Sequence, residues 1–131
     1  MSEQDNVQQI TGIFEAFGRG DIPTILDQLT DDVHWVAHLD AVVPWSGDYS
    51  GKANVPRFFE ALGGSAEVMA HPVNELIAQG DTVVATGEVT FRARATGKES
   101  SSSWVYIWKL RDGKLCSYDQ FNDPGLAAAF R

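Results

Sequence analysis

The first part of the chain has the spacing of α-helices, in which apolar residues recur every three or four positions. A first helix is expected behind Ser2 or Asp5 as its N-cap, and it should end near Gly18. A short second helix is expected behind Asp21, with Pro23 in a first turn that has no intrahelical N–H bond to lose. The apolar positions of the two helices are Val7, Ile10, Ile13, Phe14, Phe17, Ile22, Ile25, Leu26 and Leu29.

The segment that follows predicts one strand, a long loop and a third helix. Residues 33–37 form the expected strand, and the loop after it extends to Tyr49. The third helix should begin near Val55 and stop at the Gly63-Gly64 pair. Three helices are therefore expected before residue 67.

From about residue 67 onward, apolar and polar residues alternate, which is the period of a strand with one buried face. The expected strands are residues 68–78, 82–95, 102–110 and 114–122. The turns between them contain Gly80-Asp81, Thr96-Gly97 and Asp112-Gly113, which are typical of hairpins and predict an antiparallel meander. Helices followed by strands indicate an α+β fold, with helices on one face of one sheet. We expect a single domain over residues 1–131.

The composition argues against several classes of partner. Hydrophobic residues make up 44% of the 131 residues and charged residues 21%, as in globular proteins. The formal net charge of −8, with no cluster of Lys and Arg, argues against nucleic acid. No apolar run approaches the roughly 20 residues of a membrane span, so no membrane contact is expected.

The cysteine and histidine content bears on compartment and on metals. Cys116 has no second cysteine to pair with, and the polar, acidic start of the chain does not have the pattern of a signal peptide. Both features favour the cytoplasm. One cysteine and three scattered histidines give no metal-ligand spacing, and we expect neither a metal nor a cofactor.

Short sequence motifs spread along the chain resemble those of a known family. They are Gly20-Asp21, Asp31-Asp32-Val33-His34-Trp35, Gly47-x-Tyr49-x-Gly51, Val55-x-x-Phe58-Phe59, Gly80-Asp81-x-Val83-Val84, Thr96-Gly97 and Arg111-Asp112-Gly113-Lys114. In this order they resemble the nuclear transport factor 2-like superfamily, and within it the SnoaL-like and ketosteroid-isomerase-like proteins. The resemblance implies a cystatin-like cone, in which three N-terminal helices pack on a strongly curved antiparallel sheet around an apolar pocket.

The resemblance also implies which strand face lines the pocket. The expected inward residues are Trp35, Val89, Phe91, Ala93, Trp104, Tyr106, Trp108, Tyr118, Gln120 and Asn122. The alternate residues would lie on the convex face: Glu88, Thr90, Arg92, Arg94, Val105, Ile107 and Lys109. Tyr49 is expected at the pocket rim and Phe59 on its wall. Such a pocket would bind a small apolar ligand.

Three residues are candidates for chemistry. Tyr106 could donate a hydrogen bond to a carbonyl or enolate oxygen, or be a core tyrosine bonded to backbone. His38, expected at the pocket mouth, could be a general base, as could Asp40, or His38 could be a half-exposed loop residue. His71, directly before Pro72 at a strand start, is interpreted as structural.

The catalytic aspartates of the family do not carry over. The resemblance puts Trp35 where ketosteroid isomerases have their Asp base, and Tyr106 where they have the protonated Asp of the oxyanion hole. It puts Asn122 where SnoaL-like cyclases have an Asp at the end of the last strand. An amide cannot accept a substrate proton at neutral pH, so neither reaction is directly implied.

Two functions therefore stay open. One is a cofactor-independent isomerase, cyclase or dehydratase that moves protons on an apolar cyclic or carbonyl metabolite. The other is a non-catalytic ligand-binding or dimerisation module of the same fold. A homodimer through the convex sheet face is expected in either case, because Val105 and Ile107 place apolar area outside the cone.

Overall fold

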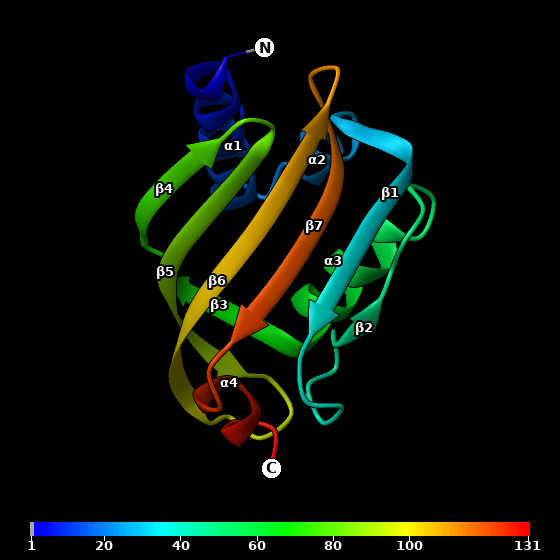
Figure 1. Cartoon of the computed structure of the whole chain (residues 1–131). Coiled ribbons are helices and arrows are strands. Elements are labelled where there is room, and N and C mark those ends of the chain that lie inside the picture. The colour runs from blue at the N-terminus through cyan, green and yellow to red at the C-terminus, as the bar shows by residue number, and fades with distance from the viewer. Residues whose placement is uncertain (1) are drawn as a thin grey trace.

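The computed structural model describes residues 2–131 as helices packed on one side of a seven-stranded, curved sheet (Figure 1). The helices are α1 (Glu3–Gly18), α2 (Ile22–Leu26), α3 (Val55–Ser65) and α4 (Gly125–Ala128). The strands are β1 (Leu29–His38), β2 (Gly47–Asp48), β3 (Ala66–Ala70), β4 (Val73–Gln79), β5 (Thr82–Ala93), β6 (Glu99–Arg111) and β7 (Lys114–Asn122). The expected α+β cone is confirmed. None of the helices in residues 2–131 is long and apolar enough to cross a membrane.

Side-chain caps fix where the first two helices begin. The Ser2 hydroxyl accepts from the Asp5 N–H, and the Asp5 carboxylate accepts from the Ser2 N–H, which makes a capping box. The Asp21 carboxylate caps α2 by accepting from the backbone N–H and the hydroxyl of Thr24. Both caps follow from the sequence. The third helix instead continues through its glycine pair and ends at Ser65.

The sheet is mixed rather than wholly antiparallel. Its order is β2-β1-β7-β6-β5-β3, with β4 also paired to β5. The strands after α3 pair antiparallel with one another as predicted, but β1 runs parallel to β7. Both of these strands start at the same end of the sheet, where Leu29 lies beside Leu115. The predicted meander is confirmed, whereas the expectation of a wholly antiparallel sheet does not hold for β1, because hairpin signals report only pairing between neighbours in the chain.

The predicted strand 68–78 is in fact two strands, β3 and β4, which pair with the two halves of β5. The break falls at His71-Pro72, since proline has no N–H to donate to a ladder. The Pro72 carbonyl still accepts from the Glu88 N–H at 3.0 Å, which holds the corner against β5. The break therefore places His71 on the inner side of the sheet.

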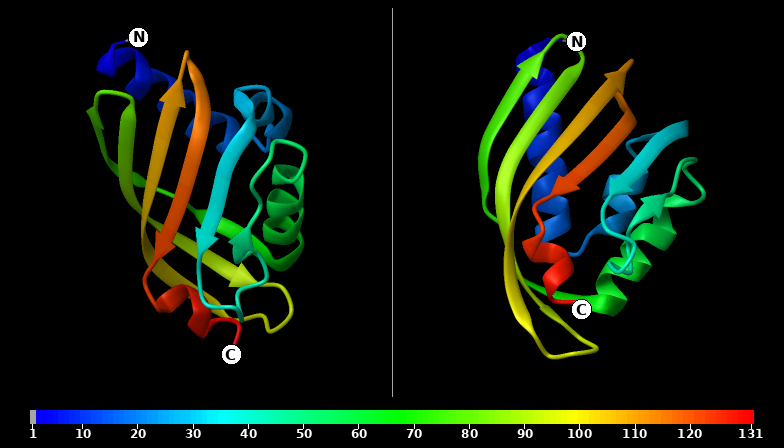
Figure 2. Two further views of the ribbon diagram at one scale, coloured as in Figure 1. Left: turned by 45° about the vertical axis from the view of Figure 1, so that its right-hand side comes forward. Right: turned by 60° about the horizontal axis from the view of Figure 1, so that its bottom comes forward.

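Buried and exposed residues alternate along β5, β6 and β7. Cross-strand partners share a face, so Tyr106 lies beside Gln120 and Trp108 beside Tyr118 on the concave side. Val105 is 37% exposed on the convex side. The sheet bends around α1, α2 and α3 on its concave side (Figure 2).

A fourth helix, α4, was not predicted from the sequence. It lies at the end of the cone where β7 finishes (Figures 1 and 2). The Ser100 hydroxyl donates to the Gly125 carbonyl at 2.9 Å, and the Thr96 hydroxyl donates to the Ala129 carbonyl at 3.1 Å. The ring of Phe130 stacks on Phe91 with centroids 6.0 Å apart. The helix is thus held by tertiary contacts, which a local pattern of four residues does not reveal.

A substitution at Gly87 would test how tightly the corner at Pro72 packs against β5. A Cβ at this position would overlap the Pro72 carbonyl oxygen and the Trp104 indole. We expect Gly87→Ala to lower the free energy of unfolding by about 2–3 kcal/mol. Gly12→Ala is the control, because nothing lies within 4 Å of its Cβ position, and it should raise that free energy by up to about 1 kcal/mol. Equal urea midpoints for the two variants would contradict the packing argument.

Candidate functional site

The helices and the concave face of the sheet enclose an aromatic cavity with a volume of about 70 Å³. Its walls come from α1, α3 and the inner faces of β1, β5, β6 and β7. The aromatic and polar lining residues are Phe14, Phe17, Trp35, Trp45, Phe58, Phe59, His71, Phe91, Tyr106, Trp108, Tyr118, Gln120 and Asn122. The remaining walls are aliphatic, so the cavity is a narrow apolar slot with a few polar groups.

One set of polar groups is a hydrogen-bonded chain on β7. The Tyr118 hydroxyl donates to the Gln120 side-chain carbonyl at 2.9 Å, and the Gln120 amide donates to the Asn122 carbonyl at 2.9 Å. The Asn122 amide donates to the Ser102 hydroxyl at 3.3 Å. Residues two apart on a strand point the same way, which is why these side chains meet. The chain fixes the amide orientations and leaves each amide a second N–H.

The other polar group in the cavity is a pair formed by His71 and Tyr106. The imidazole Nε2 lies 3.0 Å from the phenol oxygen. The imidazole stacks on the Trp104 indole at 4.8 Å, and that indole stacks on the Tyr106 ring at 4.0 Å. The indole fits there because Gly87, across the ladder, has no side chain. The backbone corner and the stack together hold the imidazole against the phenol.

Burial keeps the titratable groups of the cavity uncharged. Loss of solvation lowers the pKa of His71 from 6.5 to about 4, against a smaller opposing contribution from its own backbone. Burial raises the pKa of Tyr106 far above its ordinary value. Burial and, to a lesser extent, the neighbouring Tyr106 raise the pKa of Tyr118. At neutral pH all three side chains are therefore neutral.

The cavity has donors without acceptors. Within residues 2–131 none of its lining residues is Asp, Glu, Lys or Arg. Trp35 and Trp108 line it, and their indole N–H groups are buried with no hydrogen-bond partner in the described part of the chain. A buried donor without an acceptor costs free energy. A bound molecule with acceptor oxygens could remove that cost.

The comparisons with known proteins agree with this fold. Residues 10–118 match the family model of the SnoaL-like domain. The chain belongs to the SnoaL-like family. A search of the curated proteins found no significant match.

Solved structures support the same assignment for this SnoaL-like protein. An NTF2-like protein from Burkholderia xenovorans is 29% identical, with a TM-score of 0.89 over 100% of this chain and 99% of that one. One from Burkholderia thailandensis, at 24% identity, has a TM-score of 0.87 over 100% and 99% of the two chains. TerC, co-crystallised with polyporic acid, is 26% identical with a TM-score of 0.76 over 91% and 92%. The expected membership of the nuclear transport factor 2-like superfamily is confirmed.

Most of the expected ligand-binding residues of the SnoaL-like domain line the cavity. These are Trp35, Phe59, Phe91, Tyr106, Trp108, Tyr118, Gln120 and Asn122. Trp104 does not line it, because its ring is covered by the stack with His71 and Tyr106. Tyr49 also lies outside, where it packs edge-on against Phe58 with centroids 5.5 Å apart.

The expected position of His38 was wrong. It alternates with the inward residues of β1, so its ring lies on the convex side with His34. The two imidazole Nε2 atoms lie 2.7 Å and 2.9 Å from one carboxylate oxygen of Asp119. Burial alone raises the pKa of Asp119, but the hydrogen bonds with the two histidines outweigh burial and lower it. His38 therefore does not contact the aromatic cavity.

Asp40 was also misplaced by the sequence reading. It pairs with Arg131 at the chain end. With His38 and residues of the α4 region it lines a separate hollow. The hollow shares Asn122 and Leu126 with the aromatic cavity, but the Asp40 carboxylate lines only the hollow.

His71 is the polar residue of the cavity that sequence reasoning missed. It was interpreted as a structural residue, because it directly precedes Pro72 at a strand start. Pro72 also carried a further signal, because a proline inside a strand pattern marks an interruption. At such an interruption, the residue before the proline need not lie on the face of the sheet that strand alternation predicts for it.

The burial of His71 makes stability depend on pH. The unfolded chain binds a proton on His71 below about pH 6.5, whereas the folded chain resists it down to about pH 4. The free energy of unfolding should therefore fall as pH is lowered across this window, by roughly 3 kcal/mol in total from this residue. Urea unfolding of wild type and His71→Asn from pH 7 to 4.5 measures it. Other acidic groups titrate equally in both proteins, so parallel curves would contradict the assignment.

Proposed function

We propose that the chain is a single SnoaL-like domain that binds a small apolar molecule and moves protons on it, as isomerases, cyclases and dehydratases do. The ligand would be a cyclic or carbonyl-bearing compound. The observation that carries the proposal is the cavity itself, which is aromatic, free of charged side chains in residues 2–131 and supplied with buried donors that lack acceptors. We also place the protein in the cytoplasm, where its free Cys116 would stay reduced.

Hydrogen-bond donors favour a carbonyl ligand. The Tyr106 hydroxyl lines the cavity, and Trp35 and Trp108 in its walls carry buried indole N–H groups that have no acceptor among residues 2–131. An oxygen that gains negative charge during enolisation would be stabilised more than a neutral carbonyl, because donors in a dry site act strongly on developing charge. Tyr106 is the donor that we place at that oxygen.

TerC offers independent support for a cyclic carbonyl ligand. It was co-crystallised with polyporic acid. Polyporic acid is a quinone, and a quinone ring is flat and has carbonyl oxygens that accept hydrogen bonds. The two proteins are 26% identical over nine-tenths of their lengths. A flat ring would suit the aromatic walls of the present cavity.

The alternative is a binding module without catalysis. The observation that favours it is the lack of any carboxylate among the lining residues of the described chain. A binder requires shape and donors, whereas an enzyme also requires a group that accepts a proton.

Binding can be tested with a matched pair of probes. Acetophenone carries a ring and a carbonyl, and ethylbenzene has the ring alone. Quenching of indole fluorescence should report both, since Trp35 and Trp108 line the cavity. Tyr106→Phe should weaken acetophenone binding roughly three- to tenfold through the lost hydrogen bond and leave ethylbenzene unchanged. The control Tyr49→Phe removes a hydroxyl outside the cavity and should change neither affinity.

Catalysis can be tested with the same ketone in D₂O. Wild-type protein should accelerate deuterium exchange of the acetophenone methyl protons, followed by proton NMR, because exchange requires enolisation. Tyr106→Phe should slow the catalysed exchange by on the order of a hundredfold. Binding without accelerated exchange would support the binding module instead.

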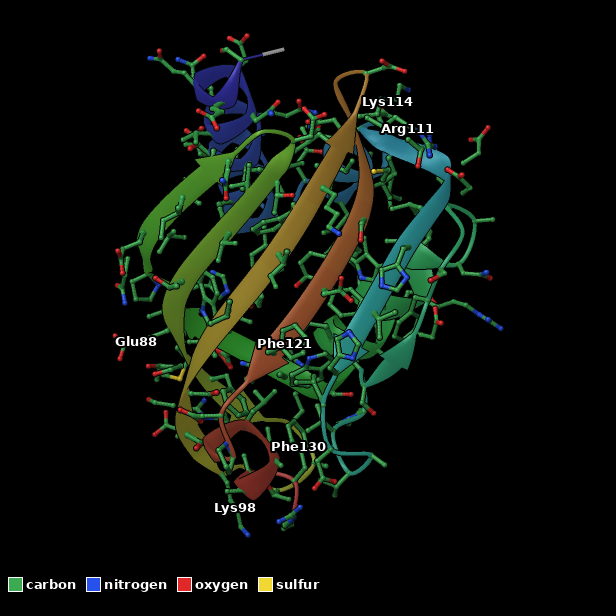
Figure 3. All side chains as sticks on the ribbon, viewed as in Figure 1. Glu88, Lys98, Arg111, Lys114, Phe121 and Phe130 are labelled. Carbon is green, nitrogen blue, oxygen red and sulfur yellow. The ribbon has the colours of Figure 1, made fainter. Side chains whose placement is uncertain are left out.

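We further propose a homodimer through the convex face of the sheet. In one row across it, Val84 lies beside Ile107, Ile107 beside Asp119, and Asp119 beside Val36. Phe121 on β7, labelled in Figure 3, adds a side chain that is 42% exposed. The one carboxylate in this row accepts from two imidazoles, which lowers the cost of covering it.

Ile107→Asp should convert the dimer to a monomer in sedimentation velocity at micromolar concentration, because it adds an unpaired charge to the centre of the face. Val42→Asp is the control, since Val42 is exposed in the loop after β1 and outside the sheet. Moderate salt should strengthen the wild-type dimer by screening the charge of −8 on each chain. A wild-type monomer at both salt concentrations would contradict the dimer.

A further inference from the structure

We propose that His71 is the proton acceptor of the cavity and that Tyr106 relays the proton to it. The inference rests on the proposed function, because it supplies the accepting group that a proton-transfer reaction requires. No carboxylate lines the cavity in residues 2–131, and the titratable groups that do are His71, Tyr106 and Tyr118. Among these, only the imidazole can accept a proton and become a cation at an accessible pH.

The contacts of His71 fit a group that must stay in place. Its Nε2 is 3.0 Å from the Tyr106 oxygen, a distance at which a proton can pass between them. Trp104 stacks on one side of the imidazole, and Phe14 and Phe17 of α1 lie 5.9 Å and 5.4 Å away by ring centroid. These neighbours are apolar, so none of them competes with Tyr106 for Nε2.

The proposed proton transfer involves three groups: the ligand, Tyr106 and His71. An acidic O–H of the ligand gives its proton to the Tyr106 oxygen. The proton that Tyr106 held passes at the same time to the lone pair of His71 Nε2. One O–H bond of the ligand breaks and one N–H bond forms, while Tyr106 ends with the same number of protons. The products are a ligand anion and an imidazolium, and the reverse transfer can return the proton to a different atom of the ligand.

Because His71 is buried, its ability to hold a proton depends on the charge of the bound ligand. Burial lowers the pKa of His71 to about 4, a loss of proton affinity of roughly 300-fold. The ligand oxygen would lie about 5 Å from Nε2, on the far side of the Tyr106 oxygen, and an anion there raises the proton affinity of the imidazole by a few hundredfold, or roughly 3 kcal/mol, at the effective dielectric constant of proteins. The imidazolium is therefore stable only beside the ligand anion that it has helped to form. His71 becomes charged when such a ligand is bound, and without one His71 and Tyr106 are both neutral.

A chromophoric acid measures the transfer directly. 4-Nitrophenol has one ring, and its neutral and ionised forms absorb at different wavelengths. In wild type the bound probe should show the nitrophenolate band at about pH 5 to 6, and its intensity should not depend on pH, because the proton stays in the protein. His71→Asn should bind the probe but show at least a tenfold weaker nitrophenolate band. His38→Asn is the matched control and should behave as wild type, since that imidazole lies on the convex face.

Tyr106→Phe provides the second test, in case the His71 variant fails to fold by near-UV circular dichroism. It keeps the ring but interrupts the relay, and it should lose the band as well. A probe that wild type binds in neutral form, or a nitrophenolate band of equal intensity in His71→Asn, would overturn the inference while leaving the small-molecule pocket in place. A probe that binds to none of the proteins would count against the pocket itself and against this inference with it.

Discussion

The contact between Gly87 and Trp104 is the constraint on which the rest of the site depends. An indole can lie over β5 only where the strand has no side chain, and Gly87 is that position. Once the indole occupies this space, it becomes the surface on which both His71 and Tyr106 stack. The neighbouring corner at Pro72 contributes by turning the chain so that the imidazole faces this surface. Strand geometry, aromatic stacking and the polar pair of the cavity thus form one connected unit.

The cavity combines strong hydrogen bonding with an absence of charge in the described residues. Its tyrosines and imidazole are kept neutral by burial, and its amides are held by the chain that runs from Tyr118 to Ser102. Neutral groups in a dry site interact with ligands through dipoles whose direction is fixed in advance. The convex face has the opposite character, since its carboxylate and imidazoles remain open to solvent. The two faces of one sheet therefore differ in chemistry because side chains alternate along each strand.

Local signals in the sequence were enough for the first three helices, the hairpins and the inner face of β5, β6 and β7. The caps at Ser2 and Asp21 and the alternation around Tyr106 depend on residues close together in the chain. The parallel pairing of β1 with β7 and the docking of α4 depend on contacts between distant segments, which no periodicity records. His38 was misplaced because the expected strand ended at residue 37, whereas β1 extends to His38 and strand alternation sets its face. His71 was missed because a strand break changes orientation in a way that depends on what lies opposite, here Gly87.

The parallel pairing of β1 and β7 also bears on how the chain folds during synthesis. Trp35 lies early in the chain, and its partner Tyr118 belongs to the last strand. The β4–β7 hairpins can form among themselves, but β1 has no place in the sheet until β7 has been made. Loop closure over such a long separation is slow. Until it occurs, β1 stays unpaired with β7 and its apolar face is incompletely covered, and this interval is when the nascent chain is most exposed to aggregation.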